Sequence, residues 1–346
     1  MASKINIGDS WKDAIPKSIN IGDSWKNIES AYINIGDSWK KWYPNRNAND
    51  GKYMYMLVNS TGVLHKSTDY GATWAPIYTS APSIKVSTNS TGKYLILCGW
   101  PDYIRVSADY GATWATKVSS SLDGKGSCIS STGQYQFCCT HSNGLYKSTN
   151  YGITWVLHSY TKKYYGIACS ETGQYVLGTG ETTGNAATTL SVSSDYGVNF
   201  SNVGSTMKYR YGGVSADGKY MLAASRGSGS GGYFYVSSDY GVNWTQKGVS
   251  NFYGCGASVS GNGKYMLVTS DNNNIVYKSS DYGVNWSSTT LGASSHFDCS
   301  ISYDGKYQLV SQFNSAKSHL STDYGANFSE IYNAANWYGC IMSVAK

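Results

Sequence analysis

Hydrophobic positions along most of the chain fall in short runs that are separated by turn-forming residues. One stretch shows the pattern in full, with four runs at Tyr253–Ser260, Tyr265–Ser270, Ile275–Ser279 and Trp286–Leu291. Short runs rich in β-branched and aromatic residues, with Gly, Asn and Asp between them, predict β-strands. No segment shows the periodicity of an amphipathic helix, so the predicted fold class is all-β.

Two short sequences recur in the turns between these runs. The first is an eight-residue repeat, Ser-x-Asp-x-Gly-x-x-Trp, whose successive copies start 40 to 45 residues apart. Its seven copies are Ser67–Trp74, Ser107–Trp114, Ser148–Trp155, Ser193–Phe200, Ser237–Trp244, Ser279–Trp286 and Ser321–Phe328. The second is a Gly-Lys/Gln-Tyr turn, which also occurs seven times. This period is that of a four-stranded blade, so residues 49–346 are predicted to form a seven-bladed β-propeller.

The order of strands within a blade predicts how the ring closes. Each blade is expected to run through strand 1, the Gly-Lys/Gln-Tyr turn, strand 2, a variable loop, strand 3, the eight-residue repeat and strand 4. No inner strand precedes Gly51, whereas Tyr338–Val344 matches the inner strands of other blades. We therefore predict that the C-terminal segment supplies strand 1 of the first blade and closes the ring, so that no sheet edge is left there.

The residues of the eight-residue repeat suit a tight turn. The Asp carboxylate is short enough to accept hydrogen bonds from turn amides, and the glycine adopts a positive φ that other residues resist. The final Trp or Phe is large enough to fill a gap between neighbouring sheets. The aspartates predicted to hold these turns are Asp69, Asp109, Asp195, Asp239, Asp281 and Asp323.

Residues 1–48 carry a different repeat and are predicted to form a separate β-hairpin arm. The phrase Ile-Asn-Ile-Gly-Asp-Ser-Trp-Lys begins at Ile5 and returns at Ile19 and Ile33, 14 residues apart each time. Its alternation and its turn predict three small hairpins, which bury too little surface to be stable alone. We therefore expect the arm to pack against another protein chain. The predicted anchors are Trp11, Trp25 and Trp39, and a flexible leader is the alternative.

The eight-residue repeat resembles the Asp-box, or BNR, repeat of sialidases, sortilin-type receptors and several glycoside hydrolases. Asn150 replaces the aspartate of the third copy, while Phe200 and Phe328 replace the tryptophan. The resemblance implies a propeller in which the repeat itself is structural. The arm is similar to the Gly-x-x-Trp-Lys repeats at the ends of bacteriophage tail and other virion proteins, which implies attachment to a virus particle.

Composition argues against several other functions. Lys and Arg exceed Asp and Glu by 27 to 21, and they are scattered, so no basic stripe suggests nucleic acid. The eight cysteines include no Cys-x-x-Cys pair and the histidines show no ligand spacing, so no metal or other cofactor is expected and the thiols are predicted to be buried. No run reaches membrane-spanning length and the N-terminus lacks the apolar core of a signal peptide. We therefore expect synthesis in a host cytoplasm and incorporation into a virion.

The resemblance to sialidases raises the question of an enzyme. Sialidases use three converging arginines, a Tyr–Glu pair and an Asp acid on six blades, whereas this chain has only four arginines and lacks the Arg-Ile/Leu-Pro motif. Four carboxylates are free of the turns and can lie on the variable face: Asp102, Glu181, Asp271 and Asp298. Different blades hold them, so we predict no enzyme. A glycan-active hydrolase that uses two such carboxylates is the alternative.

The loops between strands 2 and 3, and between blades, share one face of the predicted propeller and differ from blade to blade. Binding residues commonly lie on variable loops of a rigid scaffold, and aromatic side chains suit a glycan or protein ligand. The candidates are Trp100, Tyr164, Tyr209, Arg210 and Trp337, unless their rings only fill space between blades. The predicted function is a non-enzymatic virion or tail-associated protein with a host-binding face; a decoration protein without a ligand is a third possibility.

Overall fold

The computed structural model describes the chain in seventeen segments. They are residues 18–20, 25–27, 31–35, 38–42, 51–58, 61–79, 85–99, 102–141, 144–158, 162–182, 186–227, 232–248, 252–271, 274–292, 296–312, 318–331 and 337–342. The regular elements in these segments are all β-strands. The chain divides into two compact units, Met1–Ala48 and Asn49–Lys346.

The first unit contains two antiparallel hairpins. Strand β1 (Ser18–Asn20) pairs with β2 (Trp25–Asn27), and β3 (Ala31–Ile35) pairs with β4 (Ser38–Trp42). These hairpins correspond to the second and third copies of the arm repeat. The first copy, with Trp11, lies outside the described residues.

The second unit consists of seven antiparallel four-stranded sheets. Blade 1 contains β32 (Trp337–Met342), β5 (Met54–Val58), β6 (Val63–Ser67) and β7 (Ala75–Tyr78). Blade 2 contains β8 (Lys85–Thr88), β9 (Leu95–Cys98), β10 (Asp102–Ser107) and β11 (Ala115–Leu122). Blade 3 contains β12 (Gly124–Ile129), β13 (Gln136–Thr140), β14 (Gly144–Ser148) and β15 (Val156–His158).

The remaining four blades repeat this order. Blade 4 contains β16 (Lys162–Cys169), β17 (Val176–Thr182), β18 (Thr188–Ser193) and β19 (Ser201–Met207). Blade 5 contains β20 (Tyr209–Val214), β21 (Met221–Ser225), β22 (Phe234–Ser237) and β23 (Thr245–Lys247). Blade 6 contains β24 (Gly254–Val259), β25 (Met266–Ser270), β26 (Ile275–Ser279) and β27 (Ser287–Thr290). Blade 7 contains β28 (His296–Ile301), β29 (Gln308–Gln312), β30 (Ser318–Ser321) and β31 (Ser329–Ile331).

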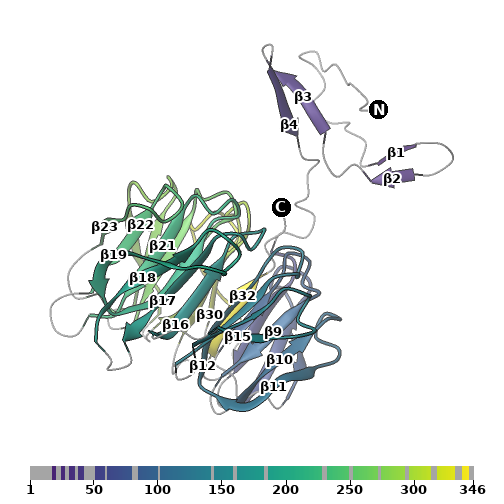
Figure 1. The fold of residues 1–346 in the computed structure, drawn as a ribbon. Coiled ribbons are helices and arrows are strands. Elements are labelled where there is room, and N and C mark those ends of the chain that lie inside the picture. The colour runs from purple at the N-terminus through teal and green to yellow at the C-terminus, as the bar shows by residue number, and fades with distance from the viewer. Residues whose placement is uncertain are drawn as a thin grey trace. The chain divides into compact units, whose positions relative to one another are not determined.

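The first strand of each sheet forms the wall of a closed ring. Strands β8, β12, β16, β20, β24, β28 and β32 contact one another in this order, and β32 contacts β8. The C-terminal strand β32 pairs with β5, with Cys340 opposite Met56 and Met342 opposite Met54. In Figure 1 the yellow β32 is accordingly drawn in the same sheet as strands from the start of the unit. The fold is a seven-bladed β-propeller closed by its C-terminal strand, which confirms the predicted architecture.

Hydrogen bonds inside the eight-residue repeat explain why it forms the same turn in every blade. In blade 6, Ser279 Oγ accepts from the amide of Gly283 at 3.0 Å and donates to Asp281 Oδ1 at 2.8 Å. Asp281 in turn accepts from the amide of Asn285 at 2.9 Å. This bond is the main cause that lowers the pKa of Asp281 below its usual value. The other five predicted turn aspartates bind the residue four positions on in the same way.

One feature of the turn differs from the expectation that only glycine takes a positive φ. The tyrosine before the glycine does so in every copy, with φ between 60° and 63° at Tyr70, Tyr110, Tyr151, Tyr196, Tyr240, Tyr282 and Tyr324. A residue with a Cβ loses about 1–2 kcal/mol in this left-handed region. The hydrogen bonds of the turn therefore hold seven bulky residues in an unfavourable conformation.

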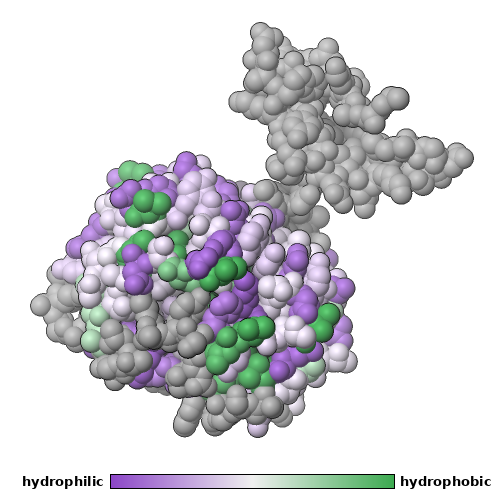
Figure 2. Space-filling model, in the orientation of Figure 1, coloured by the Kyte–Doolittle hydropathy of each residue, from purple (hydrophilic) through white to green (hydrophobic). Residues whose placement is uncertain are grey.

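Each blade packs its apolar residues against the next. The ring of Trp286, at the end of the sixth repeat, lies 4.5 Å from that of Phe234 in blade 5, and the Trp286 indole donates to the carbonyl of Gly283 at 3.0 Å. This placement is the one predicted for the repeat's last residue. On the face seen in Figure 2, hydrophobic residues form small separate groups among polar ones. The apolar residues are therefore used mainly between the sheets.

We predict that deletion of residues 336–346 will lower stability far more than an ordinary terminal truncation. The deletion removes β32 with the buried side chains of Cys340 and Met342, and a buried apolar side chain contributes about 1.5–3 kcal/mol. Thermal unfolding of this variant should be compared with that of a variant lacking only residues 345–346. Equal melting temperatures would contradict the closure by β32.

Candidate functional site

A β-bulge recurs near the start of the inner strand in six of the seven blades. At each one the register between the first two strands shifts, and one residue of the inner strand has no partner. The residues at these positions are Lys125, Tyr165, Arg210, Cys255, Phe297 and Tyr338. Bulges redirect side chains and are common beside functional sites. The six bulges lie at one end of the central channel, the end that the variable loops surround. We call this end the channel mouth.

A chain of three polar side chains joins blades 3 and 4 at this mouth. The hydroxyl of Tyr165 lies 2.7 Å from His141 Nε2, and His141 Nδ1 lies 3.3 Å from Asp123 Oδ2. Lys125 Nζ lies 2.6 Å from the other oxygen of the Asp123 carboxylate. The bulge places Lys125 and Tyr165, whereas Asp123 precedes β12 and His141 follows β13.

Arg210, from blade 5, extends this cluster. Its guanidinium carbon lies 3.5 Å from the centroid of the Tyr165 ring, a cation–π contact, and its Nη2 lies 2.7 Å from Oε1 of Glu181. The Glu181 side chain is 2% exposed and that of Arg210 16%. The nitrogen Nε of Arg210 has no hydrogen-bond partner among the described residues. This nitrogen is itself buried, so it lies inside the cluster and not on the surface of the mouth.

His141 is held in its neutral form by its surroundings. Burial is the largest cause that lowers its pKa, the positive charge of Lys163 acts in the same direction, and Asp123 opposes both. A neutral imidazole can donate from Nδ1 to Asp123 and accept at Nε2 from the Tyr165 hydroxyl. This order of hydroxyl, imidazole and carboxylate can polarise the hydroxyl, as in a general-base relay.

Deeper in the channel an ion pair spans blades that are not neighbours. Lys85 Nζ of blade 2 lies 2.6 Å from Asp298 Oδ2 of blade 7 and 4.8 Å from the ring centroid of Tyr211 in blade 5. Asp298 Oδ2 also accepts from the amide of Cys340 at 3.2 Å. Burial is the largest single influence and would lower the pKa of Lys85, but the charge of Asp298, the nearby Tyr211 and the hydrogen bond to Asp298 together outweigh it and raise the pKa. Burial raises the pKa of Tyr211 to about 12.

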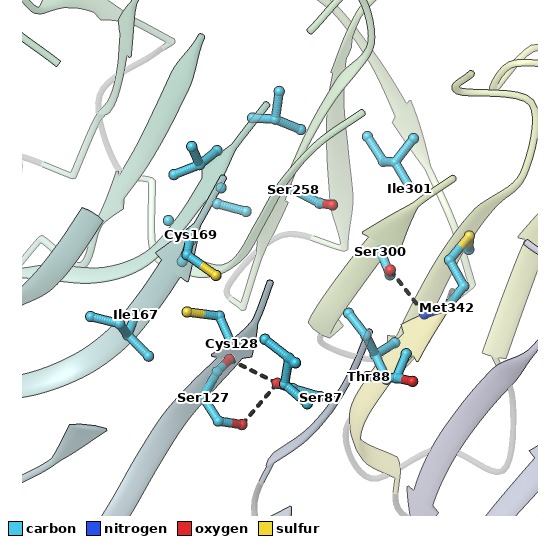
Figure 3. Close-up of a pocket in the computed structure, with 18 of the residues that line it drawn as sticks. Ser87, Thr88, Ser127, Cys128, Ile167, Cys169, Ser258, Ser300, Ile301 and Met342 are labelled. Atoms are coloured by element: carbon cyan, nitrogen blue, oxygen red, sulfur yellow. Dashed lines mark hydrogen bonds between the residues drawn. The ribbon is translucent and has the colours of Figure 1, made fainter. Parts of the chain in front are cut away.

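The ion pair lies in the wall of a cavity of about 210 Å³ within the channel, which small polar, sulfur-containing and apolar side chains also line. Figure 3 shows Ser87, Ser127, Ser300, Cys128 and Cys169 in this wall. Ser87 Oγ donates to the carbonyl of Ser127 at 2.7 Å, and Ser300 Oγ accepts from the amide of Met342 at 3.2 Å. The wall's polar groups thus bind one another. The described cysteines are all free thiols, and six of the eight are buried.

The structure brings only part of the predicted ligand-binding set to the mouth. Arg210 lies there, but Tyr164 and Tyr209 are 1% and 0% exposed. The prediction of an accessible ring is wrong for these two tyrosines, because they precede the bulge and point into the space between blades. Trp100 lies outside the described residues. Trp337 begins β32, and the structure does not describe its side chain.

Three of the four candidate carboxylates lie beside a cation. Glu181 contacts Arg210, Asp298 contacts Lys85, and Asp271 Oδ2 lies 3.9 Å from Arg226 Nη2. Asp102 begins β10, and its side chain is not described. The described residues include no group of three or more His, Cys, Asp or Glu side chains that could hold a metal ion. They also include no helix long and apolar enough to cross a membrane.

Sequence reasoning missed Asp123, Lys125 and His141. Alignment of the blades on their Gly-Lys/Gln-Tyr turns would have placed Lys125, Tyr165 and Arg210 at one equivalent position. The contact of His141 with Tyr165 depends on the loop of one blade reaching the inner strand of the next. No spacing within the sequence reveals that contact.

We predict that His141 titrates below the ordinary histidine value of about 6.5. Its unfolded form then binds a proton more readily than its folded form, so its contribution favours unfolding as the pH falls from that value. NMR titration of the imidazole should show a further decrease in Asp123→Asn and an increase in Lys163→Gln. A pKa at or above 6.5 in the wild type would contradict this arrangement.

Comparison with known proteins supports the fold and goes no further. No family model and no curated protein sequence matches the chain. Among solved structures, a xyloglucanase of glycoside hydrolase family 74 from Xanthomonas campestris has a TM-score of 0.59 at 12% identity, over 87% of this chain and 55% of that one. The hydrazine synthase of Kuenenia stuttgartiensis has a TM-score of 0.57 at 13% identity, over 85% and 99%. YCF48 bound to a D1 peptide has a TM-score of 0.55 at 11% identity, over 81% and 85%. The chain is similar to these proteins in fold.

Proposed function

We propose that this chain is a non-enzymatic attachment protein of a virus particle, and that the channel mouth binds a host-surface glycan or protein. The observation that carries the proposal is the convergence of Lys125, Tyr165 and Arg210 from three successive blades. A site that gathers cations, aromatic rings and hydrogen-bonding groups at the rim of a rigid scaffold is suited to recognition.

The charges of the mouth favour a ligand that carries a carboxylate. Three cations, Lys163, Lys125 and Arg210, lie close enough to His141 for their positive charges to add to burial in lowering its pKa. The Arg210 side chain is 16% exposed, and a guanidinium forms charge-assisted hydrogen bonds to an acidic group. The ring of Tyr211 lies nearby in the channel.

The described carboxylates argue against the two-carboxylate hydrolase. A glycosidase needs two carboxyl groups that face the same glycosidic bond. Glu181 and Asp298 are instead each engaged in an ion pair within 2.7 Å, with Arg210 and with Lys85. A hydrolase remains the second candidate because of a different feature, the chain of Tyr165, His141 and Asp123.

We propose that the first unit, residues 1–48, joins the propeller to another virion or tail protein. The support is its separate compactness and its hairpins, of which β2 and β4 contain Trp25 and Trp39. Two-stranded hairpins are marginally stable in isolation. Burial of one such tryptophan against a partner contributes on the order of 2–3 kcal/mol.

The mouth is tested by binding of the full chain to an array of acidic and neutral glycans and to host-surface proteins. We expect a ligand with an acidic group, and at least ten-fold weaker binding in Arg210→Met, which corresponds to about 1.4 kcal/mol. Lys117→Met, on the outer strand β11, makes the same charge change and should bind like the wild type. If a folded wild type binds nothing, the decoration role is favoured. Sugar or ester release that is lost in His141→Ala and in Tyr165→Phe would favour the hydrolase.

The arm makes a separate prediction. Removal of residues 1–48 should leave a folded propeller with an unchanged melting temperature that no longer sediments with the particle or oligomer that the full chain joins. Replacement of Trp11, Trp25 and Trp39 by alanine should have the same effect. Undiminished association of either variant would contradict the anchoring role.

A further inference from the structure

The tyrosine at the fourth position of the eight-residue repeat is retained more strictly than the turn requires. It is present in all seven copies, although the aspartate is replaced once and the tryptophan twice. Its positive φ, as in Tyr282 at 63°, disfavours a bulky residue and would suit asparagine or glycine. Something other than turn geometry therefore selects the tyrosine.

Each of these tyrosines packs its ring against that of a second tyrosine from the preceding blade, with two pairs stacked and five tilted. The partner is the tyrosine of the Gly-Lys/Gln-Tyr turn; for example, Tyr282 lies 5.0 Å from Tyr220, and Tyr240 lies 4.9 Å from Tyr175. The seven centroid distances range from 4.7 to 5.9 Å, and the pair Tyr70–Tyr307 closes the ring between blades 1 and 7. We call these seven pairs the tyrosine ring. They lie at the end of the propeller opposite the channel mouth.

Stacking between blades does not account for every property of the ring. Phenylalanine would stack equally well, and it does replace tryptophan in Phe200 and Phe328, yet all 14 ring positions carry a hydroxyl. Six of the seven repeat tyrosines are also 36–47% exposed. A surface that repeats an accessible phenol around a rigid ring is suited to contact with a ligand.

The charge of this end points to a neutral ligand. The seven eight-residue repeats contain six aspartates and no lysine or arginine, and the seven Gly-Lys/Gln-Tyr turns contribute five lysines. Each of these lysines lies 5.2–5.5 Å from the ring centroid of the tyrosine that follows it. Lys66, Lys247 and Lys278 donate to repeat carbonyls of the next blade, and Asp217 and Asp304 accept in the turns. Acidic and basic groups are thus close to balanced, without the cation excess that binds nucleic acids and other polyanions.

A pocket at one of the seven interfaces shows the same chemistry. It lies between the repeats of blades 1 and 7, has a volume of about 690 Å³, and is lined by Tyr70 and Trp74 together with Thr73, Asp323, Asn327 and Glu330. No lysine or arginine lines it. Aromatic faces beside hydroxyl, amide and carboxylate groups match the apolar faces and hydroxyl groups of a sugar.

We propose that the tyrosine ring is a seven-fold repeated binding site for a neutral polysaccharide, with one sugar stacked at each inter-blade position. A single shallow site of this kind binds weakly. Because a polysaccharide repeats its own units, several sites can engage one chain, and the gain over one site can reach about 10²–10⁴-fold. This role is independent of the acidic ligand at the channel mouth.

The full chain can be tested by electrophoresis through gels that contain soluble neutral polysaccharides, such as dextran, β-glucan and galactomannan, or hyaluronan as an acidic control. We expect retardation by at least one neutral polymer. The triple variant Tyr240→Asn, Tyr282→Asn and Tyr324→Asn should bind at least ten-fold more weakly. Asparagine tolerates a positive φ, which offsets part of the stability lost with the three inter-blade ring contacts. Binding is therefore compared at a temperature at which thermal unfolding shows both proteins to be folded.

Two controls separate this site from the mouth and from the fold. Arg210→Met should keep its affinity for the neutral polymer, since it alters only the mouth. The corresponding Tyr→Phe triple variant keeps the stacking and tests the hydroxyl; it should bind with intermediate affinity. The proposal is overturned if no neutral polysaccharide retards the wild type, if the asparagine variant binds equally well, or if the ring tyrosines bind only proteins.

Discussion

The hydrogen bond from the Gly283 amide to Ser279 Oγ, repeated in every blade, is the interaction on which the propeller most depends. It closes the turn around Asp281 and fixes where strand 4 begins. The first residue after the turn, Trp286, is thereby aimed at Phe234 in the neighbouring sheet. The turn therefore specifies the geometry within a blade and also the contact between blades. Since seven blades must close without a gap, small errors at this turn would accumulate around the ring.

The repeat turns are uniform at one end of the propeller, whereas the residues at the opposite end, the channel mouth, differ between blades. Six of the seven inner strands share a bulge near their start, but the residue at the bulge is Lys125, Tyr165 and Arg210 in three successive blades and Cys255, Phe297 and Tyr338 in the others. A constant backbone with a variable side chain produces a chemically distinct patch without any change of fold. The chain of Tyr165, His141 and Asp123 arises in this way, because only blades 3 and 4 supply its members.

The architecture was predictable because it depends on local signals that occur seven times. The closure by β32 was predictable because blade 1 has no inner strand before Gly51, while an additional inner-strand sequence follows blade 7 at the C-terminus. The site was less predictable, and Tyr164 and Tyr209 show the reason. Along an ordinary strand alternate residues share a face, but a bulge shifts that alternation by one position. Tyr164 is therefore buried, while its neighbour Tyr165 reaches the mouth.

Internal repeats hold information that a single copy does not. Asp281 and Trp286 have clear structural tasks, yet their equivalents vary between copies as long as the task is met: Asn150 Oδ1 accepts from the Thr154 amide at 2.9 Å, as an aspartate would. Tyr282 has an unfavourable φ and no comparable task within its own turn, but its equivalents do not vary. Asparagine or glycine would adopt this positive φ at a lower free-energy cost. The retention of tyrosine in all seven copies is therefore best explained by a requirement outside the turn. Packing between blades accounts for the aromatic ring, and the proposed contact with a ligand accounts for the hydroxyl that phenylalanine would lack.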